Sequence, residues 1–287
     1  MTPSSINEYI TTKNFAEFNV LDSAKLDDVK LLTTNENIYH GIKKNESVTV
    51  DYTCLSEMRE AANWPYEHFT YTLNYHGFRM PVTPEEIDIG VFGCSFTFGT
   101  GMPVSGLWHT ILGERLKQSI GNFGIAGISA TSALDIFLIV SKHVRMKKAI
   151  FLLPSFNRYQ VAVKNEEISN IQYMNTIPNN PSRLCESFGL LTEQVYKALP
   201  DEQFYKDVRN KLYITDMIAK NRNIDTYVTT WEHNSYEFME HMKFNHIKLL
   251  PEWNHPPEII DDKARDGMHP GFNLNLFFAE LITPHIK

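Results

Sequence analysis

The sequence has few cysteines, no long apolar run and no excess of positive charge. Its 287 residues include three cysteines, an odd and widely spaced set that forms neither a disulfide framework nor the ligand spacing of a zinc site. Lysine and arginine number 27 against 34 acidic residues, and the net charge of -7 argues against a nucleic-acid-binding surface. We therefore expect no nucleic-acid partner and a core that needs no disulfide.

Targeting and membrane signals are also missing from the sequence. Residues 1–18 lack both the basic start and the apolar stretch of a signal peptide. No apolar run approaches the roughly 20 residues that cross a bilayer. The expectation is a cytoplasmic protein with no membrane span, and its oligomeric state is left open.

Motifs for phosphate and metal chemistry are absent as well. No glycine-rich stretch continues into the Lys-Ser/Thr of a Walker A loop, and no Gly-x-Gly-x-x-Gly follows a predicted strand. Cys94 has threonine rather than arginine six residues later, which excludes a phosphatase loop. His241 and His246 are five residues apart and do not share a helical face, so we expect no zinc site there. The sequence predicts no cofactor and no metal.

What remains is an ordinary globular composition, with 43% hydrophobic and 21% charged residues. Residues 1–70 are polar and irregular, and we expect them to form an N-terminal extension packed on the main domain. Residues 71–287 are predicted to form that domain. The proline-containing stretch at about 160–200 is interpreted as an insertion with short helices at most.

A buried strand followed by a turn and a helix is predicted around residues 87–116. The apolar run from Ile87 to Phe92 ends at Gly93, and small residues and glycines follow it. Helical spacing of apolar residues resumes at Leu107. Ser95 therefore lies on a turn between a buried strand and a helix, at the sheet edge where α/β proteins bind ligands.

Strands and helices then alternate along the chain. We expect a helix that begins near Ser129 and ends at Lys147 and Lys148, where cations favour the helix dipole. Strands are predicted at 122–125, 149–153 and 224–230, and an amphipathic helix closes the chain from about residue 274. This alternation predicts a three-layer α/β/α fold with a mostly parallel sheet.

The residues of a serine-based acyl transfer site occur in this frame. Asp266 and His269 lie three apart in a loop before the last helix, so the carboxylate can fix the tautomer of the imidazole and leave its other nitrogen for Ser95. Oxyanion donors are available from the Ser95 amide, the Gly127 amide and the Asn157 side chain. Taken singly, Asn157 would be an ordinary turn residue and His269 a helix cap.

In this order the motifs resemble the SGNH (GDSL-like) hydrolase superfamily. The matching blocks are Gly93–Gly99, Asn122–Gly127, Asn157 and Asp266–Pro270, and Asn74–Arg79 resembles a segment that precedes the serine strand in some members. The resemblance spans about residues 74–282. It implies a flavodoxin-like fold and ester or thioester hydrolysis, with Ser95 as nucleophile, His269 as base, Asp266 as its orienting acid and an oxyanion hole of Ser95, Gly127 and Asn157.

Two positions depart from the superfamily pattern. Cys94 stands where the superfamily usually has aspartate, and the third block reads Ser155–Arg158 instead of Gly-x-Asn-Asp. The donor Asn157 is retained, but the changed neighbours are expected to reshape the pocket for the acyl group or the alcohol.

Three further residues are candidates for weak substrate contacts: Phe156, Trp253 and His255. Core packing is the alternative for them.

The hypothesis is a serine esterase that cleaves a small-molecule or glycan ester, with an O-acetyl group on a carbohydrate as one candidate by analogy. A non-catalytic binding module and an acyltransferase on the same fold are the alternatives.

Overall fold

The computed structural model describes residues 47–50, 69–164, 171–176, 201–254, 256–259, 261–264 and 266–286. Most of the predicted N-terminal extension and most of the predicted insertion lie outside these described residues. Near the predicted boundary at residue 70, β1 (Ser47–Val50) pairs antiparallel with β2 (Phe69–Thr72) in a small sheet of its own.

Five parallel strands form the central sheet, in the order β4-β3-β5-β8-β9. Counted along the chain, this order is 2-1-3-4-5, the flavodoxin-like arrangement, whose topological switch point lies between β3 and β5. The strands are β3 (Glu86–Gly93), β4 (Ile120–Asn122), β5 (Arg145–Leu153), β8 (Asp225–Thr230) and β9 (Lys248–Leu249). The predicted parallel sheet is confirmed.

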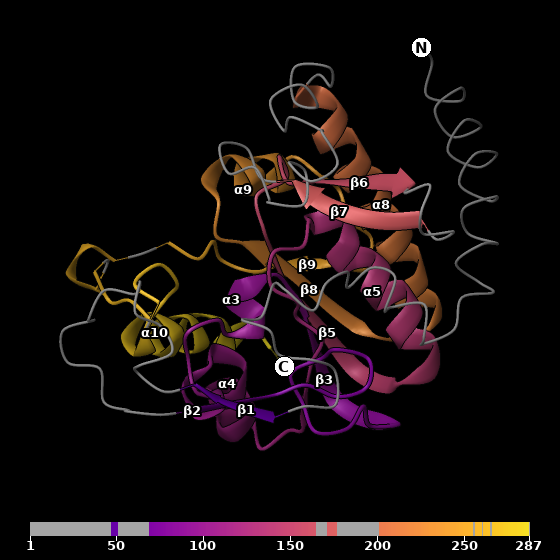
Figure 1. The fold of residues 1–287 in the computed structure, drawn as a ribbon. Helices are drawn as coiled ribbons and strands as arrows, with labels where there is room; N and C mark the ends of the chain where they lie inside the picture. Colours follow the sequence, from indigo (N-terminus) through magenta and orange to yellow (C-terminus); the bar gives the residue numbers. More distant parts are fainter. Residues whose placement is uncertain are drawn as a thin grey trace, which may run out of the picture.

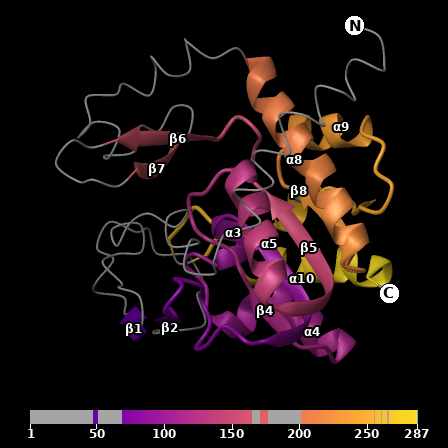
Figure 2. The ribbon, with the colours of Figure 1, turned by 90° about the vertical axis from the view of Figure 1, so that its right-hand side faces the viewer.

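Helices cover both faces of this sheet (Figures 1 and 2). The α-helices are α3 (Ser95–Phe98), α4 (Trp108–Leu116), α5 (Ala130–His143), α8 (Asp201–Asn221), α9 (His233–Glu240) and α10 (Phe272–Ile282). Short 3₁₀ helices lie at Val104–Gly106, Pro257–Ile259 and Thr283–His285. α5 and α8 pack on one face, and α4 and α10 pack on the other, so the predicted three-layer α/β/α fold is confirmed.

The alternation of side chains along β5 shows how one strand serves both layers. Ile150 and Leu152 are buried together with Phe278 of α10. Phe151 points to the opposite face, where its ring lies 5.3 Å from that of Phe137 in α5. Because successive residues of a strand face opposite sides, an unbroken apolar run is what a strand buried on both faces requires.

The end of α5 differs from the sequence-based prediction. The helix stops at His143, and Lys147 and Lys148 belong to β5 rather than to the helix. Pairing with β3 explains the difference, since Lys148 lies opposite Ile89 and the Lys147 ammonium binds the Asp88 carboxylate at 2.7 Å. The cations of the last helical turn are Lys142 and His143 instead.

Two other elements differ from expectation. The region predicted to hold at most short helices contains an antiparallel pair, β6 (Tyr159–Lys164) and β7 (Ile171–Thr176), outside the central sheet (Figure 2). Half of the residues in each segment are β-branched or aromatic, the residue types that favour strands. The short strand expected at 122–125 occurs earlier, as β4, because it pairs with β3 in register from Ile120.

Candidate active site

The turn that carries Ser95 depends on the absence of a side chain at Gly93. A Cβ atom at this position would lie 2.2 Å from the Leu152 carbonyl oxygen of the neighbouring strand. β3 can therefore run close to β5 up to its last residue and then turn at once into α3. Ser95 is the first residue of that helix, and it is 7% exposed. Its amide lies at the helix N-terminus, where no intrahelical acceptor is available.

The Ser95 hydroxyl donates a weak hydrogen bond to Cys94 Sγ, with an oxygen–sulfur distance of 3.9 Å. Cys94 is fully buried. Within the described part of the chain, no hydrogen bond joins Ser95 to His269. The hydroxyl thus occupies a rotamer directed at the residue that replaces the aspartate of the superfamily pattern.

A buried arginine fixes the loop that follows α3. Arg79, 3% exposed, donates to the carbonyl oxygens of Phe98, Gly99 and Met102 at 3.1, 2.6 and 2.6 Å. Its guanidinium lies 4.2 Å from the centroid of the Tyr71 ring. Burial lowers the pKa of Arg79 to about 10, although its interaction with Tyr71 acts in the opposite direction. The cation is thus held by carbonyl dipoles and an aromatic face.

The loop before α10 is a tight turn closed by its own backbone. The Ala264 amide donates to the His269 carbonyl oxygen at 2.7 Å, and Gly267 adopts a positive φ of 68°. Asp266 accepts from the backbone amides of Met268 and His269 at 3.0 and 2.9 Å through one carboxylate oxygen. The other oxygen accepts a hydrogen bond from His269 Nδ1. The spacing of three residues therefore brings the two side chains together.

This arrangement determines the charge of Asp266 and the tautomer of His269. Burial raises the pKa of Asp266, which is 5% exposed, but the hydrogen bonds and charge of His269 and the Met268 amide outweigh it and leave the pKa below its usual value. An ionised Asp266 can only accept, so His269 Nδ1 carries the hydrogen of this bond, and in a neutral imidazole Nε2 is then the nitrogen that has the lone pair.

The two loops are in direct contact although they are far apart in the sequence. The ring of Phe96, the residue after Ser95, meets the His269 ring edge-on with centroids 5.7 Å apart. A Cβ atom on Gly101 would lie 3.1 Å from the carboxyl carbon of Asp266. The carboxyl end of β3 and the loop before α10 therefore form one site.

The two other candidate oxyanion donors also follow strands of the sheet. Gly127, with a φ of 79°, lies in the turn after β4, and the same loop passes α3 so closely that a Cβ at Gly124 would lie 2.6 Å from the Phe98 amide nitrogen. Asn157 follows β5, and its side-chain oxygen accepts from the Ser155 hydroxyl at 2.8 Å. This bond turns the amide nitrogen of Asn157, the donor, away from Ser155.

Two of the three candidate substrate contacts are buried, as in the core-packing alternative. Phe156 is 0% exposed and packs against the rings of Tyr205 and Phe238. Trp253 is 1% exposed and stacks on Phe278 at 4.3 Å. Both are core residues here, because aromatic side chains after a strand can turn inward as readily as toward the site. His255 lies outside the described residues.

An aromatic wall formed by Phe96, Trp231 and Trp253 adjoins the site, and Trp231 in it was not predicted from the sequence. Trp231, directly after β8, stacks on Phe96 with ring centroids 5.0 Å apart, and Trp253 supports the same ring edge-on at 5.5 Å. The position of Trp231 at the carboxyl end of a predicted strand was the signal that could have identified it.

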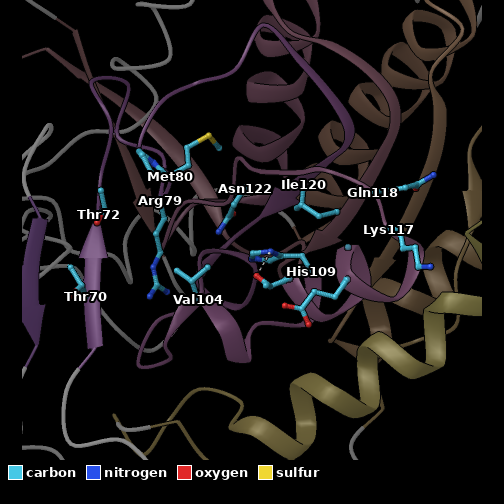
Figure 3. Close-up of a pocket in the computed structure, with 14 residues that line it drawn as sticks. Thr70, Thr72, Arg79, Met80, Val104, His109, Lys117, Gln118, Ile120 and Asn122 are labelled. Carbon is cyan, nitrogen blue, oxygen red and sulfur yellow. Dashed lines mark hydrogen bonds between the residues drawn. The ribbon is translucent and has the colours of Figure 1, made fainter.

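A cavity of about 620 Å³ is lined in part by Arg79 and His109 (Figure 3). Its walls come from β2, α4, β4 and the segment with Arg79, and Ser95, Asp266 and His269 are not among its lining residues. His109, one of the lining residues, donates through Nε2 to the Thr97 carbonyl oxygen at 3.1 Å. The cavity therefore adjoins the back of the α3 loop and not the Ser95 hydroxyl.

The described residues contain no group of three or more His, Cys, Asp or Glu side chains arranged to hold a metal ion. No helix among them is both long and apolar enough to cross a membrane.

No family model and no curated protein matches the sequence. Among solved structures, a lipolytic protein of the G-D-S-L family from Desulfitobacterium hafniense DCB-2 is 13% identical, with 70% of this chain and 99% of that chain covered and a TM-score of 0.43. The acetyl xylan esterase Est2A from the rumen bacterium Butyrivibrio proteoclasticus is 11% identical, with 72% and 64% covered and a TM-score of 0.42. The psychrotrophic esterase EstA from Pseudoalteromonas sp. is 11% identical, with 71% and 97% covered and a TM-score of 0.41.

The flavodoxin-like strand order, with the four motif blocks at the ends of the strands and before the last helix, is the fold that the resemblance to SGNH hydrolases predicts.

Proposed function

We propose that the protein is a serine acyl hydrolase that cleaves a small ester through Ser95, His269 and Asp266. The observation that carries the proposal is the hydrogen-bonded Asp266–His269 pair, held against the Ser95 turn by Phe96 and Gly101. A nucleophile, a base and an acid that orients the base are what this chemistry requires, and here two distant segments of the chain supply them. The expected substrate is a small-molecule or glycan ester, with a carbohydrate O-acetyl group as one candidate.

In the proposed reaction, the Ser95 hydroxyl first rotates away from Cys94 toward His269 Nε2. The oxygen attacks the ester carbonyl carbon and its proton passes to Nε2, while Asp266 stabilises the resulting imidazolium. Collapse of the tetrahedral intermediate breaks the bond to the alcohol, which leaves with that proton. Water then attacks the acyl-enzyme by the same route in reverse, which releases the acid and restores the serine.

The negative oxygen of the intermediate would be stabilised by three donors. We assign this role to the Ser95 amide at the N-terminus of α3, the Gly127 amide and the Asn157 side chain. Donors of this kind contribute most when they are fixed before the reaction. The bond from Ser155 to Asn157 and the packing of the Gly124 loop on α3 provide such fixation.

A fluorophosphonate probe and p-nitrophenyl acetate test the proposal directly. The wild-type protein should react with the probe at Ser95, as located by peptide mass mapping, and should release p-nitrophenol. Ser95→Ala should lower turnover by about 10⁴-fold or more. Equal turnover in the wild type and in Ser95→Ala would reject the assignment.

Cys94→Ala is the matched control, because it alters the neighbouring buried side chain and leaves the serine in place. It should retain probe labelling and ester turnover. Loss of labelling in Cys94→Ala together with labelling in Ser95→Ala would instead identify the thiol as the nucleophile.

A second candidate is a binding module that does not catalyse. It is favoured by the Ser95 hydroxyl, which is directed at Cys94 Sγ and not hydrogen-bonded to His269. In that case the probe would leave Ser95 unlabelled, while an ester-bearing glycan would still bind with the same affinity to wild type and Ser95→Ala.

A further inference from the structure

Arg158 lies beside the proposed site, with its guanidinium over the face of an aromatic ring. It follows Asn157 after the carboxyl end of β5, and its guanidinium carbon is 5.4 Å from the centroid of the Trp231 ring. A guanidinium stacked on an aromatic face keeps its N–H donors at its edge, where they can bind a further group.

No carboxylate among the described residues neutralises this cation. The acid beside Trp231 in the sequence, Glu232, is occupied elsewhere, since it accepts from the amides of Asn234 and Ser235 at 3.2 and 2.8 Å and caps α9. Arg158 is also only partly buried, so a ligand can reach it without a large desolvation cost.

Arg158 is connected to the reacting groups by a continuous series of rings. Trp231 stacks on Phe96 at 5.0 Å, and Phe96 meets His269 at 5.7 Å. These residues come from the carboxyl ends of β3, β5 and β8 and from the loop before α10. A cation therefore stands at one end of an aromatic wall whose other end is the proposed base.

We propose that Arg158 binds a carboxylate of the substrate, so that the protein selects esters that carry a negative charge close to the scissile bond. This inference rests on the proposed function and adds the substrate class. It also accounts for the third motif block, in which arginine replaces the aspartate of the superfamily pattern, because an aspartate there would repel such a substrate. The planar guanidinium matches a carboxylate in a bidentate geometry.

Two pairs of esters test the charge preference and locate the charge. In the alcohol arm, 4-acetoxybenzoate is compared with 4-acetoxybenzamide. In the acyl arm, phenyl hydrogen succinate is compared with phenyl succinamate. For each pair, kcat/KM of the acid is divided by kcat/KM of the amide in wild type, Arg158→Gln and Arg145→Gln. Arg145 lies at the opposite end of β5, so its variant makes the same charge change away from the site.

The acid-to-amide ratio should fall about five- to tenfold in Arg158→Gln, the size expected for one partly exposed charge pair with good geometry. It should stay at the wild-type value in Arg145→Gln. The arm in which it falls tells whether the carboxylate belongs to the acyl group or to the alcohol. Equal ratios in wild type and Arg158→Gln in both arms would overturn the inference while leaving ester hydrolysis intact.

Binding to Ser95→Ala protein separates this inference from the failure of hydrolysis. Calorimetric titration with 4-acetoxybenzoate, 4-acetoxybenzamide, phenyl hydrogen succinate and phenyl succinamate needs no turnover. At least one acid should bind about five- to tenfold more tightly than its amide, and Arg158→Gln in the same background should remove the difference. Equal affinities within both pairs would overturn the carboxylate subsite even if Ser95 proves to be the nucleophile.

Discussion

Gly101 and Asp266 lie so close together that a Cβ atom on the glycine would be 3.1 Å from the carboxyl carbon of the aspartate. Gly101 belongs to the loop after the Ser95 helix, and Asp266 orients His269. Their contact joins the loop that follows the proposed nucleophile to the loop that carries the proposed base. It also means that a small change at Gly101, outside the reacting groups, should be transmitted to them.

Gly101→Ala is expected to lower kcat about tenfold or more, because displacement of catalytic groups by an ångström has effects of this size. The φ of 76° at Gly101 adds a backbone cost of about 1 kcal/mol for a residue with a Cβ. Ester kinetics and thermal unfolding of the same sample check both effects. Wild-type kcat in a variant with a lowered Tm would show that the contact has no role in positioning.

Arg79 should matter for activity as well as stability, because its three hydrogen bonds hold the loop that contains Gly101. Lysine cannot span three carbonyl oxygens as the planar guanidinium does. Arg79→Lys should therefore lower kcat with less effect on KM and reduce the free energy of unfolding by about 2 kcal/mol or more. Steady-state kinetics and urea unfolding measure the two quantities.

Chemical rescue distinguishes positioning by Arg79 from a general loss of folding. Addition of guanidinium at concentrations too low to denature should restore part of the activity of Arg79→Ala. Tyr71→Phe is a smaller change to the same loop, because it removes only the hydrogen bond that the Tyr71 oxygen accepts from the Gly101 amide at 2.6 Å. Rescue of neither activity nor Tm in Arg79→Ala would argue that the loop cannot be rebuilt around a free cation.

The buried side chain of His109 should make the free energy of unfolding depend on pH. Burial, together with the charge of Arg79, lowers its pKa to about 3, although the bond to the Thr97 carbonyl acts in the opposite direction. The unfolded chain binds a proton at His109 near pH 6.5 while the folded chain does not, so stability is complete above that pH and falls as the pH drops toward 3. The loss should be about 2 kcal/mol between pH 6.5 and 5.

Urea unfolding at pH 7 and pH 5 measures this loss, and His109→Gln should show a smaller difference between the two. His241 offers a control, because it is exposed and His241→Gln should leave the difference unchanged. An identical pH dependence in wild type and His109→Gln would contradict the prediction.

The sheet and the Asp266–His269 pair could be anticipated from sequence because each depends on local spacing. An apolar run that ends at a glycine predicts β3, and Ser129 does cap α5 by accepting from the Ser132 amide at 3.1 Å. The position where α5 gives way to β5 could not be predicted, because Lys147 is stabilised in the strand by Asp88, a partner supplied by the tertiary fold.

Side-chain directions at the site were the least predictable feature. Whether an aromatic residue after a strand enters the core, as Phe156 does, or joins the wall of the site, as Trp231 does, depends on what fills the space beside it. The hydroxyl direction of Ser95 depends on a single torsion and leaves no trace in the sequence. The hydrogen bonds from Arg79 to the loop after α3 join two segments about 20 residues apart, and no local pattern in the sequence indicates them.

Asp266→Asn tests the tautomer on which the proposed mechanism depends. The asparagine would keep the shape of the turn, but its amide can donate to His269 Nδ1 and so move the imidazole hydrogen to Nε2, where the nitrogen can no longer accept the Ser95 proton. We expect kcat to fall about 10³- to 10⁴-fold with little change in KM, as for the corresponding change in other serine triads. A matched control is Asp262→Asn, which alters a carboxylate that accepts from the Leu274 amide at 2.9 Å at the start of α10 and does not contact His269. If the two variants lose activity equally, the effect of Asp266 is structural and the His269 tautomer is not what limits the reaction.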